Sequence, residues 1–171
     1  MFLRKSTILS VFFILYLLIL VWIIIFKLQL SFTSLPDERT LNLVPFYDGN
    51  IERVGIYVGE KIYNLLLFVP FGLYVCLLSR DRAFINNLKP IFLTSLSFEV
   101  VQLIFGIGTS DVTDLIMNTL GGAVGIGIFK MFEKKFKDIG YKHALIFTYF
   151  LSVLMCLFIL FIKMFIKIKV N

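Results

Sequence analysis

The chain has 171 residues, of which 59% are hydrophobic and only 16% charged, and its formal net charge at pH 7 is +6. Its mean hydropathy of +0.93 excludes a soluble globular domain and predicts an integral membrane protein. Because the basic residues lie between apolar runs, with no soluble module to carry a binding face, the net charge does not indicate a nucleic-acid partner.

Five apolar runs follow one another along the chain and predict five transmembrane helices, since about 20 apolar residues cross a bilayer core of roughly 30 Å. The first run is too long for the apolar part of a signal peptide, so we expect it to be retained as an anchor. The third contains Glu99 and the fourth is rich in glycine, so both should face other helices. We therefore predict an all-α membrane bundle forming one domain, residues 1–171, with spans at about 6–26, 62–79, 90–106, 113–131 and 144–162.

The distribution of Lys and Arg predicts the orientation, because basic residues are retained on the cytoplasmic side. An amino terminus inside the cell places ten of the 17 basic residues in the cytoplasm, namely Arg4, Lys5, Arg80, Arg82, Lys89, Lys130, Lys134, Lys135, Lys137 and Lys142. The remaining seven, with Lys163, Lys167 and Lys169 among them, then lie outside. We predict this orientation, with the carboxyl terminus outside.

The outer loop between the first two runs is the one extended stretch outside the predicted spans. It carries Asn42-Leu43-Val44-Pro45-Phe46, which mixes turn-forming and interfacial residues. Within it, Asn42, Pro45 and Phe46 are candidate functional residues. Residues Ile51–Tyr63 are expected to form an amphipathic helix on the outer surface before the second span begins.

A string of polar residues in the third and fourth runs is the main candidate for a functional site: Glu99, Gln102, Asp111, Asp114 and Asn118. A carboxylate within a span costs about 2.5–3.5 kcal/mol on insertion scales, so Glu99 should have a partner or a role. Glu99 and Gln102 share one helix face, and the other three share another. Together with Asn64 they are expected to cluster in the outer half of the bundle, beneath the loop.

These residues also have structural interpretations. Asp111 is placed as a helix N-cap, and Asp114 stands at the capping-box position. The amides of Asn64, Gln102 and Asn118 are typical of hydrogen bonds between membrane helices.

Small residues in the fourth run form a ridge, Gly121-x-x-x-Gly125 with Gly122 beside it. This spacing lets two membrane helices approach closely. We predict that Gly121, Gly122 and Gly125 act in helix packing.

The sequence contains no His/Cys ligand cluster and no G-x-S-x-G, Walker or H-E-x-x-H signature. We therefore expect no metal and no cofactor, and no catalytic residue can be assigned from a motif. Carboxylates with amides are also able to hold a hard cation or to act as acid and base on a lipid-linked substrate, and their spacing does not choose between these.

Four motifs, in this order, resemble the VanZ family: Asn42-Leu43-Val44-Pro45-Phe46, Asn64-x-x-x-Phe68-Val69-Pro70-Phe71-Gly72, Ser97-Phe98-Glu99-x-x-Gln102 and Thr113-Asp114-x-x-x-Asn118-Thr119-x-Gly121-Gly122. The resemblance covers about residues 10–130. Many members carry an Arg shortly before the first Asp of the last motif, where this chain has Gly108-Thr109-Ser110.

The resemblance implies a multi-pass protein of the cell membrane of Gram-positive bacteria, associated with lowered susceptibility to teicoplanin and related lipoglycopeptides. It implies membrane lipids, and a lipid-linked envelope component or the lipoglycopeptide, as partners. We favour a non-enzymatic protein acting at the outer face of the membrane. An intramembrane enzyme using Glu99 or Asp114 as base is the alternative, and an ion-coupled transporter has less support because no internal repeat is visible.

Overall fold

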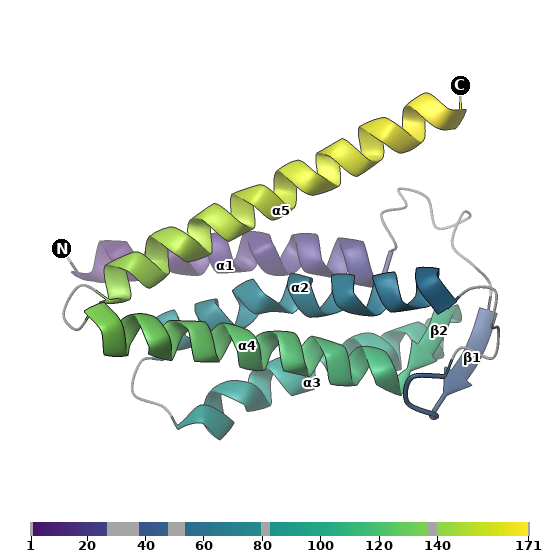
Figure 1. The fold of residues 1–171 in the computed structure, drawn as a ribbon, viewed down its shortest axis with the longest axis horizontal. Coiled ribbons are helices and arrows are strands. Elements are labelled where there is room, and N and C mark those ends of the chain that lie inside the picture. Colours follow the sequence, from purple (N-terminus) through teal and green to yellow (C-terminus); the bar gives the residue numbers. More distant parts are fainter. Residues whose placement is uncertain (1, 27–37, 48–53, 80–82, 137–139, 171) are drawn as a thin grey trace.

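Five helices and two short strands make up the computed structural model of this chain in the part that it describes, residues 2–26, 38–47, 54–79, 83–136 and 140–170 (Figure 1). Their order is α1 (Phe2–Ile24), β1 (Glu38–Asn42), α2 (Val54–Leu78), α3 (Phe84–Phe105), β2 (Ile107–Asp111), α4 (Val112–Phe136) and α5 (Gly140–Val170). The first four helices lie side by side, and successive ones run in opposite directions, whereas α5 leaves the bundle at an angle (Figure 1).

Among the residues that the structure describes, four helices are long and apolar enough to cross a membrane: α1 over Thr7–Ile24, α2 over Tyr57–Leu78, α3 over Phe84–Phe105 and α4 over Val112–Phe136. They correspond to the first four predicted spans, and each helix is longer than the apolar run that predicted it. The fifth predicted span, at 144–162, falls within α5, and its crossing of the membrane stays a prediction. The all-α membrane bundle is thus confirmed for the helices described.

The surface helix predicted over Ile51–Tyr63 is wrong for the residues that the structure describes. Val54 to Tyr63 form the first turns of α2, which continues without a break to Leu78. The reason is that residues 57–78 already satisfy the length and hydropathy of a span, so the amphipathic start and the apolar run join into one helix. Ile51–Arg53 lie outside the described residues, as do Arg80, Arg82 and Lys137 of the orientation argument.

A two-stranded parallel sheet closes one end of the bundle. β1 pairs with β2 in the register Glu38↔Ile107 to Asn42↔Asp111, and the Thr40 hydroxyl donates to the Thr109 hydroxyl at 2.8 Å. Parallel strands need a long crossover connection, and here α2 and α3 supply it. We call this the sheet end, and the opposite end, with Lys130, Lys134, Lys135 and Lys142, the lysine end (Figure 1).

A left-handed glycine makes the turn from α3 into β2. Gly106 has φ 65° and ψ 29°, and its N–H donates to the Gln102 carbonyl, which caps the helix. A left-handed residue directly after a helix is usually glycine because a Cβ there is strained. This turn sends the chain straight into β2 and so brings Asp111 back towards α3.

Aromatic side chains from α1 and α2 form one part of the core of the bundle. The buried Tyr16 hydroxyl donates to the Leu67 carbonyl at 2.7 Å, and its ring contacts the rings of Phe71 and Tyr74. A Tyr hydroxyl buried in a low-dielectric region needs such an acceptor. This contact ties α1 to the middle of α2.

Glycines allow α2 and α4 to touch backbone to backbone. A Cβ on Gly121 would lie 2.0 Å from the Leu65 carbonyl oxygen, and one on Gly125 would lie 2.1 Å from the Val69 carbonyl oxygen. Gly122 faces the Ile91 side chain of α3, where an added Cβ would lie 2.5 Å from Cγ2. The ridge therefore lets α4 lie directly on α2, which aligns the polar residues at the sheet end of both helices.

Candidate functional site

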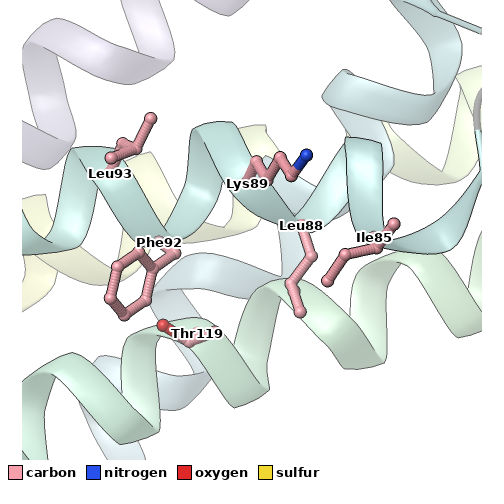
Figure 2. A pocket seen from close by; sticks show the side chains of 6 residues that line it. All are labelled: Ile85, Leu88, Lys89, Phe92, Leu93 and Thr119. Atoms are coloured by element: carbon pink, nitrogen blue, oxygen red, sulfur yellow. The ribbon is translucent and has the colours of Figure 1, made fainter.

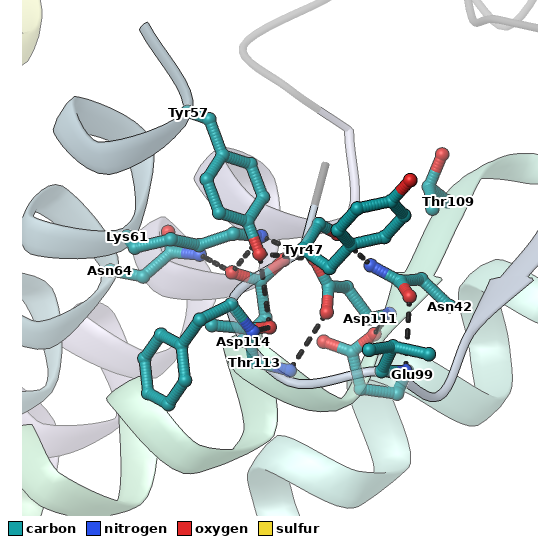
Figure 3. Close-up of polar contacts among 12 residues, drawn as sticks. Asn42, Tyr47, Tyr57, Lys61, Asn64, Glu99, Thr109, Asp111, Thr113 and Asp114 are labelled. Carbon is teal, nitrogen blue, oxygen red and sulfur yellow. Dashed lines mark hydrogen bonds and ion pairs between the residues drawn. The ribbon is translucent and has the colours of Figure 1, made fainter. Parts of the chain in front are cut away.

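Polar side chains from four elements meet at the sheet end of the bundle (Figure 3). We call them the Lys61 cluster, which consists of Tyr57, Lys61 and Asn64 from α2, Glu99 from α3, Asp111 from β2, and Thr113 and Asp114 from α4. The close α2–α4 contact and the turn at Gly106 are what bring these elements together.

Lys61 is the centre of this cluster. Its Nζ donates to Asp111 Oδ2 and to Asp114 Oδ1, each at 2.8 Å. It also lies 4.7 Å from the centroid of the Tyr57 ring, and only 7% of the residue is exposed. A buried ammonium is tolerated only when it is paired and hydrogen-bonded, and here two carboxylates and an aromatic face provide that pairing.

Asp111 joins three parts of the site. Its Oδ1 accepts the Thr113 backbone N–H at 2.8 Å, which makes it the N-cap of α4, and its own N–H donates to Glu99 Oε2 at 2.8 Å. Burial raises the pKa of Asp111, but the Lys61 ammonium and the hydrogen bonds from Thr113 outweigh it and hold this pKa below its ordinary value. Asp111 therefore carries its charge throughout the neutral range.

The Asp114 side chain does not make the capping-box hydrogen bond that its position in the sequence predicts. Its carboxylate points across to α2, where Oδ1 accepts Lys61 and also the Asn64 amide at 2.6 Å. The Lys61 charge is a better partner for a carboxylate than the backbone N–H of its own helix. Asn64 and Asp114 thus lie together at the sheet end, as the sequence predicted.

Glu99 lies at the base of the cluster, and 5% of the residue is exposed. Its Oε2 holds the Asp111 N–H, whereas its Oε1 is buried without a hydrogen bond from any residue that the structure describes. The cluster thus contains three carboxylates and one ammonium. Glu99 Oε1 is therefore an acceptor inside the protein that can take a further hydrogen bond.

The Asn42–Tyr47 loop stands above the cluster and is held by its own hydrogen bonds. Asn42 Oδ1 accepts the Val44 N–H and its amide donates to the Tyr47 carbonyl. The Phe46 N–H donates to Thr113 Oγ1 at 2.9 Å, and Phe46 has a left-handed φ of 59°. A non-glycine residue keeps such a backbone only where its surroundings fix it. The contacts around this loop therefore determine its conformation.

Most side chains of this loop are apolar and exposed, whereas its backbone is hydrogen-bonded to Thr113 below it. The exposed fractions are 67% for Leu43, 58% for Val44, 63% for Phe46 and 61% for Tyr47. Pro45 is exposed too. A fixed loop that carries four exposed apolar side chains in a row is typical of an interaction surface.

Two of the predicted residues lie apart from the cluster. Gln102 donates to the Ile24 carbonyl in α1 at 3.0 Å, and Asn118 donates to Ser95 Oγ of α3 at 2.9 Å. Asn118 follows Asp114 by one helical turn, which places it deeper in the bundle. The single cluster expected from the sequence is therefore divided, and these two amides connect helices.

The sequence does not single out Tyr57 or Lys61 as site residues, and it shows Thr113 only as a member of a family motif. From the sequence alone Lys61 is a basic residue of the outer loop, because the second span is expected to begin at residue 62. A signal was present, since Tyr57, Lys61 and Asn64 are spaced by four and three residues and share one face of a helix.

No group of three or more His, Cys, Asp or Glu side chains is arranged to hold a metal ion in the described part of the chain. In the Lys61 cluster the Lys61 ammonium occupies the position between the Asp111 and Asp114 carboxylates that a metal ion would need. The site can hold its charges fixed below the loop, and Glu99 can accept a further hydrogen bond or a proton.

Comparison with known proteins gives two matches. Residues 13–133 match the model of the family described as VanZ/LLP1. The chain is also 34% identical over 146 residues to Protein VanZ of Enterococcus faecium, an alignment that covers 84% of this chain and 86% of that protein. No solved structure matches the chain.

Proposed function

Because this chain belongs to the VanZ/LLP1 family, we propose that it lowers the susceptibility of a Gram-positive bacterium to teicoplanin and related lipoglycopeptides, acting at the outer face of the cell membrane. The observation that carries the proposal is the fixed Asn42–Tyr47 loop, which presents apolar side chains directly above the buried Lys61 cluster. The loop is the contact surface, and the cluster is the support that fixes its position.

The charges at the two ends of the bundle support placing the loop outside. Lys130, Lys134, Lys135 and Lys142 lie at the lysine end, where α4 finishes and α5 begins. At the sheet end the Lys61 charge is neutralised by carboxylates. Lys and Arg residues near the ends of spans are retained in the cytoplasm, so the four lysines favour an orientation in which the lysine end faces inward.

This orientation predicts which positions react with a reagent that cannot cross the membrane. In a chain with Cys76 and Cys156 replaced by alanine, Leu43→Cys should be labelled by a charged maleimide in intact cells. Lys134→Cys, which is also exposed, should be labelled only after the cells are permeabilised. The reverse pattern would place the loop in the cytoplasm and end the outer-face proposal.

The loop fits a ligand with a lipid tail. Its exposed residues are aliphatic or aromatic, and three of its backbone polar groups, the Val44 N–H, the Phe46 N–H and the Tyr47 carbonyl, already have hydrogen-bond partners. Such a surface gains free energy by burying apolar area, about 25 cal/mol per Å², and offers little to a purely polar ligand. A lipid-tailed antibiotic that inserts at the outer leaflet meets this surface, whereas one without a tail does not.

We therefore expect the resistance conferred by this chain to be larger for teicoplanin than for vancomycin. The double variant Leu43→Ser with Phe46→Asn should lose most of the teicoplanin effect, because it removes the two most exposed large apolar side chains of the loop. Asparagine tolerates the left-handed backbone of residue 46, and the Phe46 N–H remains to donate to Thr113, so the loop should keep its shape. The measurement is the inhibitory concentration of both drugs in a susceptible Gram-positive host, with labelled teicoplanin bound per cell.

The matched control is Leu41→Ser, which removes an apolar side chain of similar exposure from β1 rather than from the loop. It should keep resistance at equal membrane abundance. An equal shift for both drugs would contradict recognition of a lipid tail. Clear resistance with unchanged teicoplanin binding would support the second candidate, an intramembrane enzyme on a lipid-linked envelope precursor, which the unpartnered Glu99 Oε1 favours.

A further inference from the structure

An apolar groove lies between α3 and α4, away from the Lys61 cluster (Figure 2). It has a volume of about 410 Å³ and is lined by Ile85, Leu88, Lys89, Phe92, Leu93 and Thr119. Ile85, Phe92 and Leu93 are exposed within α3, a helix long and apolar enough to span the membrane. The groove therefore opens towards lipid and not into the bundle.

Positive charge lies beside one end of this groove, whose own lining surface is apolar, the stem of Lys89 included. The Lys89 side chain points towards the Ile85 end and away from Leu93 (Figure 2). At the same end, Lys130 Nζ lies 5.3 Å from the centroid of the Phe84 ring. Among the described residues, no carboxylate forms an ion pair with Lys89 or Lys130.

The rest of the groove offers no polar partner to a ligand. The Thr119 hydroxyl donates to the Leu115 carbonyl of its own helix at 2.7 Å, and the other lining side chains beyond Lys89 are apolar. From Ile85 to Leu93 the groove follows eight residues of helix, or about 12 Å. That length reaches through most of one leaflet, which is about half of the roughly 30 Å core.

We propose that this groove binds an anionic phospholipid of the membrane in which the chain sits. The phosphate and headgroup lie against Lys89 and Lys130, and one acyl chain lies along Leu88, Phe92 and Thr119. Basic pockets between membrane helices bind anionic headgroups in this way, and each lysine near the surface adds about a five-fold gain in affinity. A zwitterionic lipid with the same acyl chains would make the same apolar contacts in the groove but would gain no net charge attraction to the two lysines.

The test is lipid binding to the purified full-length chain in a neutral detergent. Native mass spectrometry and thermal shift would compare phosphatidylglycerol with phosphatidylcholine of identical acyl chains. Phosphatidylglycerol should bind more tightly, and the double variant Lys89→Gln with Lys130→Gln should weaken its binding by about 25-fold, with no change for phosphatidylcholine. The matched control is Lys134→Gln with Lys142→Gln, which removes two exposed lysines of the same end outside the groove.

A second variant tests the apolar part. Thr119→Leu fills the groove without breaking a bond to another helix, so it should weaken binding of both lipids by several-fold. Equal binding of the two lipids by the unaltered chain would overturn the proposal. So would an equal loss in the control variant, because binding would then reflect the net charge of the lysine end alone.

Discussion

Replacing Lys61 by methionine is expected to cost this protein about 3 kcal/mol of stability, because it leaves the buried Asp111 carboxylate and the half-buried Asp114 carboxylate facing each other without a cation. The methionine keeps the apolar stem of the lysine, so the loss reports the charge and not the packing. We expect a lower midpoint of thermal unfolding in detergent, lower abundance in the membrane and loss of resistance. The measurements are a melting curve, a membrane immunoblot and teicoplanin susceptibility.

A charge-neutral variant separates the structural role of the cluster from its functional role. Lys61→Met combined with Asp111→Asn and Asp114→Asn removes the three charges of the two ion pairs and leaves Glu99 unchanged, so stability should return most of the way. If resistance also returned, the cluster would serve only to hold the fold. The exposed neighbour Glu60 provides the control, since Glu60→Gln should change neither property.

Gly125→Ala is expected to disrupt the bundle although it adds only one methyl group. The new Cβ would lie 2.1 Å from the Val69 carbonyl oxygen and 3.0 Å from the Gly72 Cα, and backbone cannot move aside as a side chain can. Overpacking of a core costs about 1–3 kcal/mol, and more where the neighbour is rigid. We expect at least about 3 kcal/mol of destabilisation, measured by thermal unfolding and by membrane abundance.

Gly127 on the same helix is the matched control. A Cβ there would meet nothing within 4 Å, so Gly127→Ala should leave stability unchanged or raise it by up to about 1 kcal/mol through helix propensity. Comparable losses in the two variants would show that the effect belongs to glycine in this helix and not to the α2–α4 contact.

The sequence predicted the parts of this fold that depend on one element at a time. Apolar runs of sufficient length identified α1 to α4, and the cost of burying Glu99 pointed to the end of the bundle where the Lys61 cluster lies. The N-cap interpretation of Asp111 is also confirmed, because capping depends on local spacing alone. Each of these inferences needs only hydropathy or the helical period.

The parts that the sequence did not predict depend on contacts between distant elements. Four of the five residues 38–42, ERTLN, are polar, and the stretch resembles a loop until β2 is placed beside it. The role of Lys61 is likewise invisible until α2 and α4 are in contact, because a basic residue near the start of a span is usually read as an interfacial anchor. Gln102 and Asn118 share helix faces with Glu99 and Asp114, but helical period alone does not give their depth in the bundle.

The parallel pairing of β1 with β2 has a consequence for biosynthesis. Thr40 and Thr109 lie 69 residues apart, which at 5–20 residues per second is roughly 3–14 s of translation. During that time α2 and α3 must both enter the membrane while β1 has no strand to pair with and Lys61 has neither carboxylate. The sheet end is therefore completed only after α2 and α3 are in the membrane, and a nascent chain that stalls before Ile107 exposes an open strand edge and a bare lysine, which distinguish it from the finished protein.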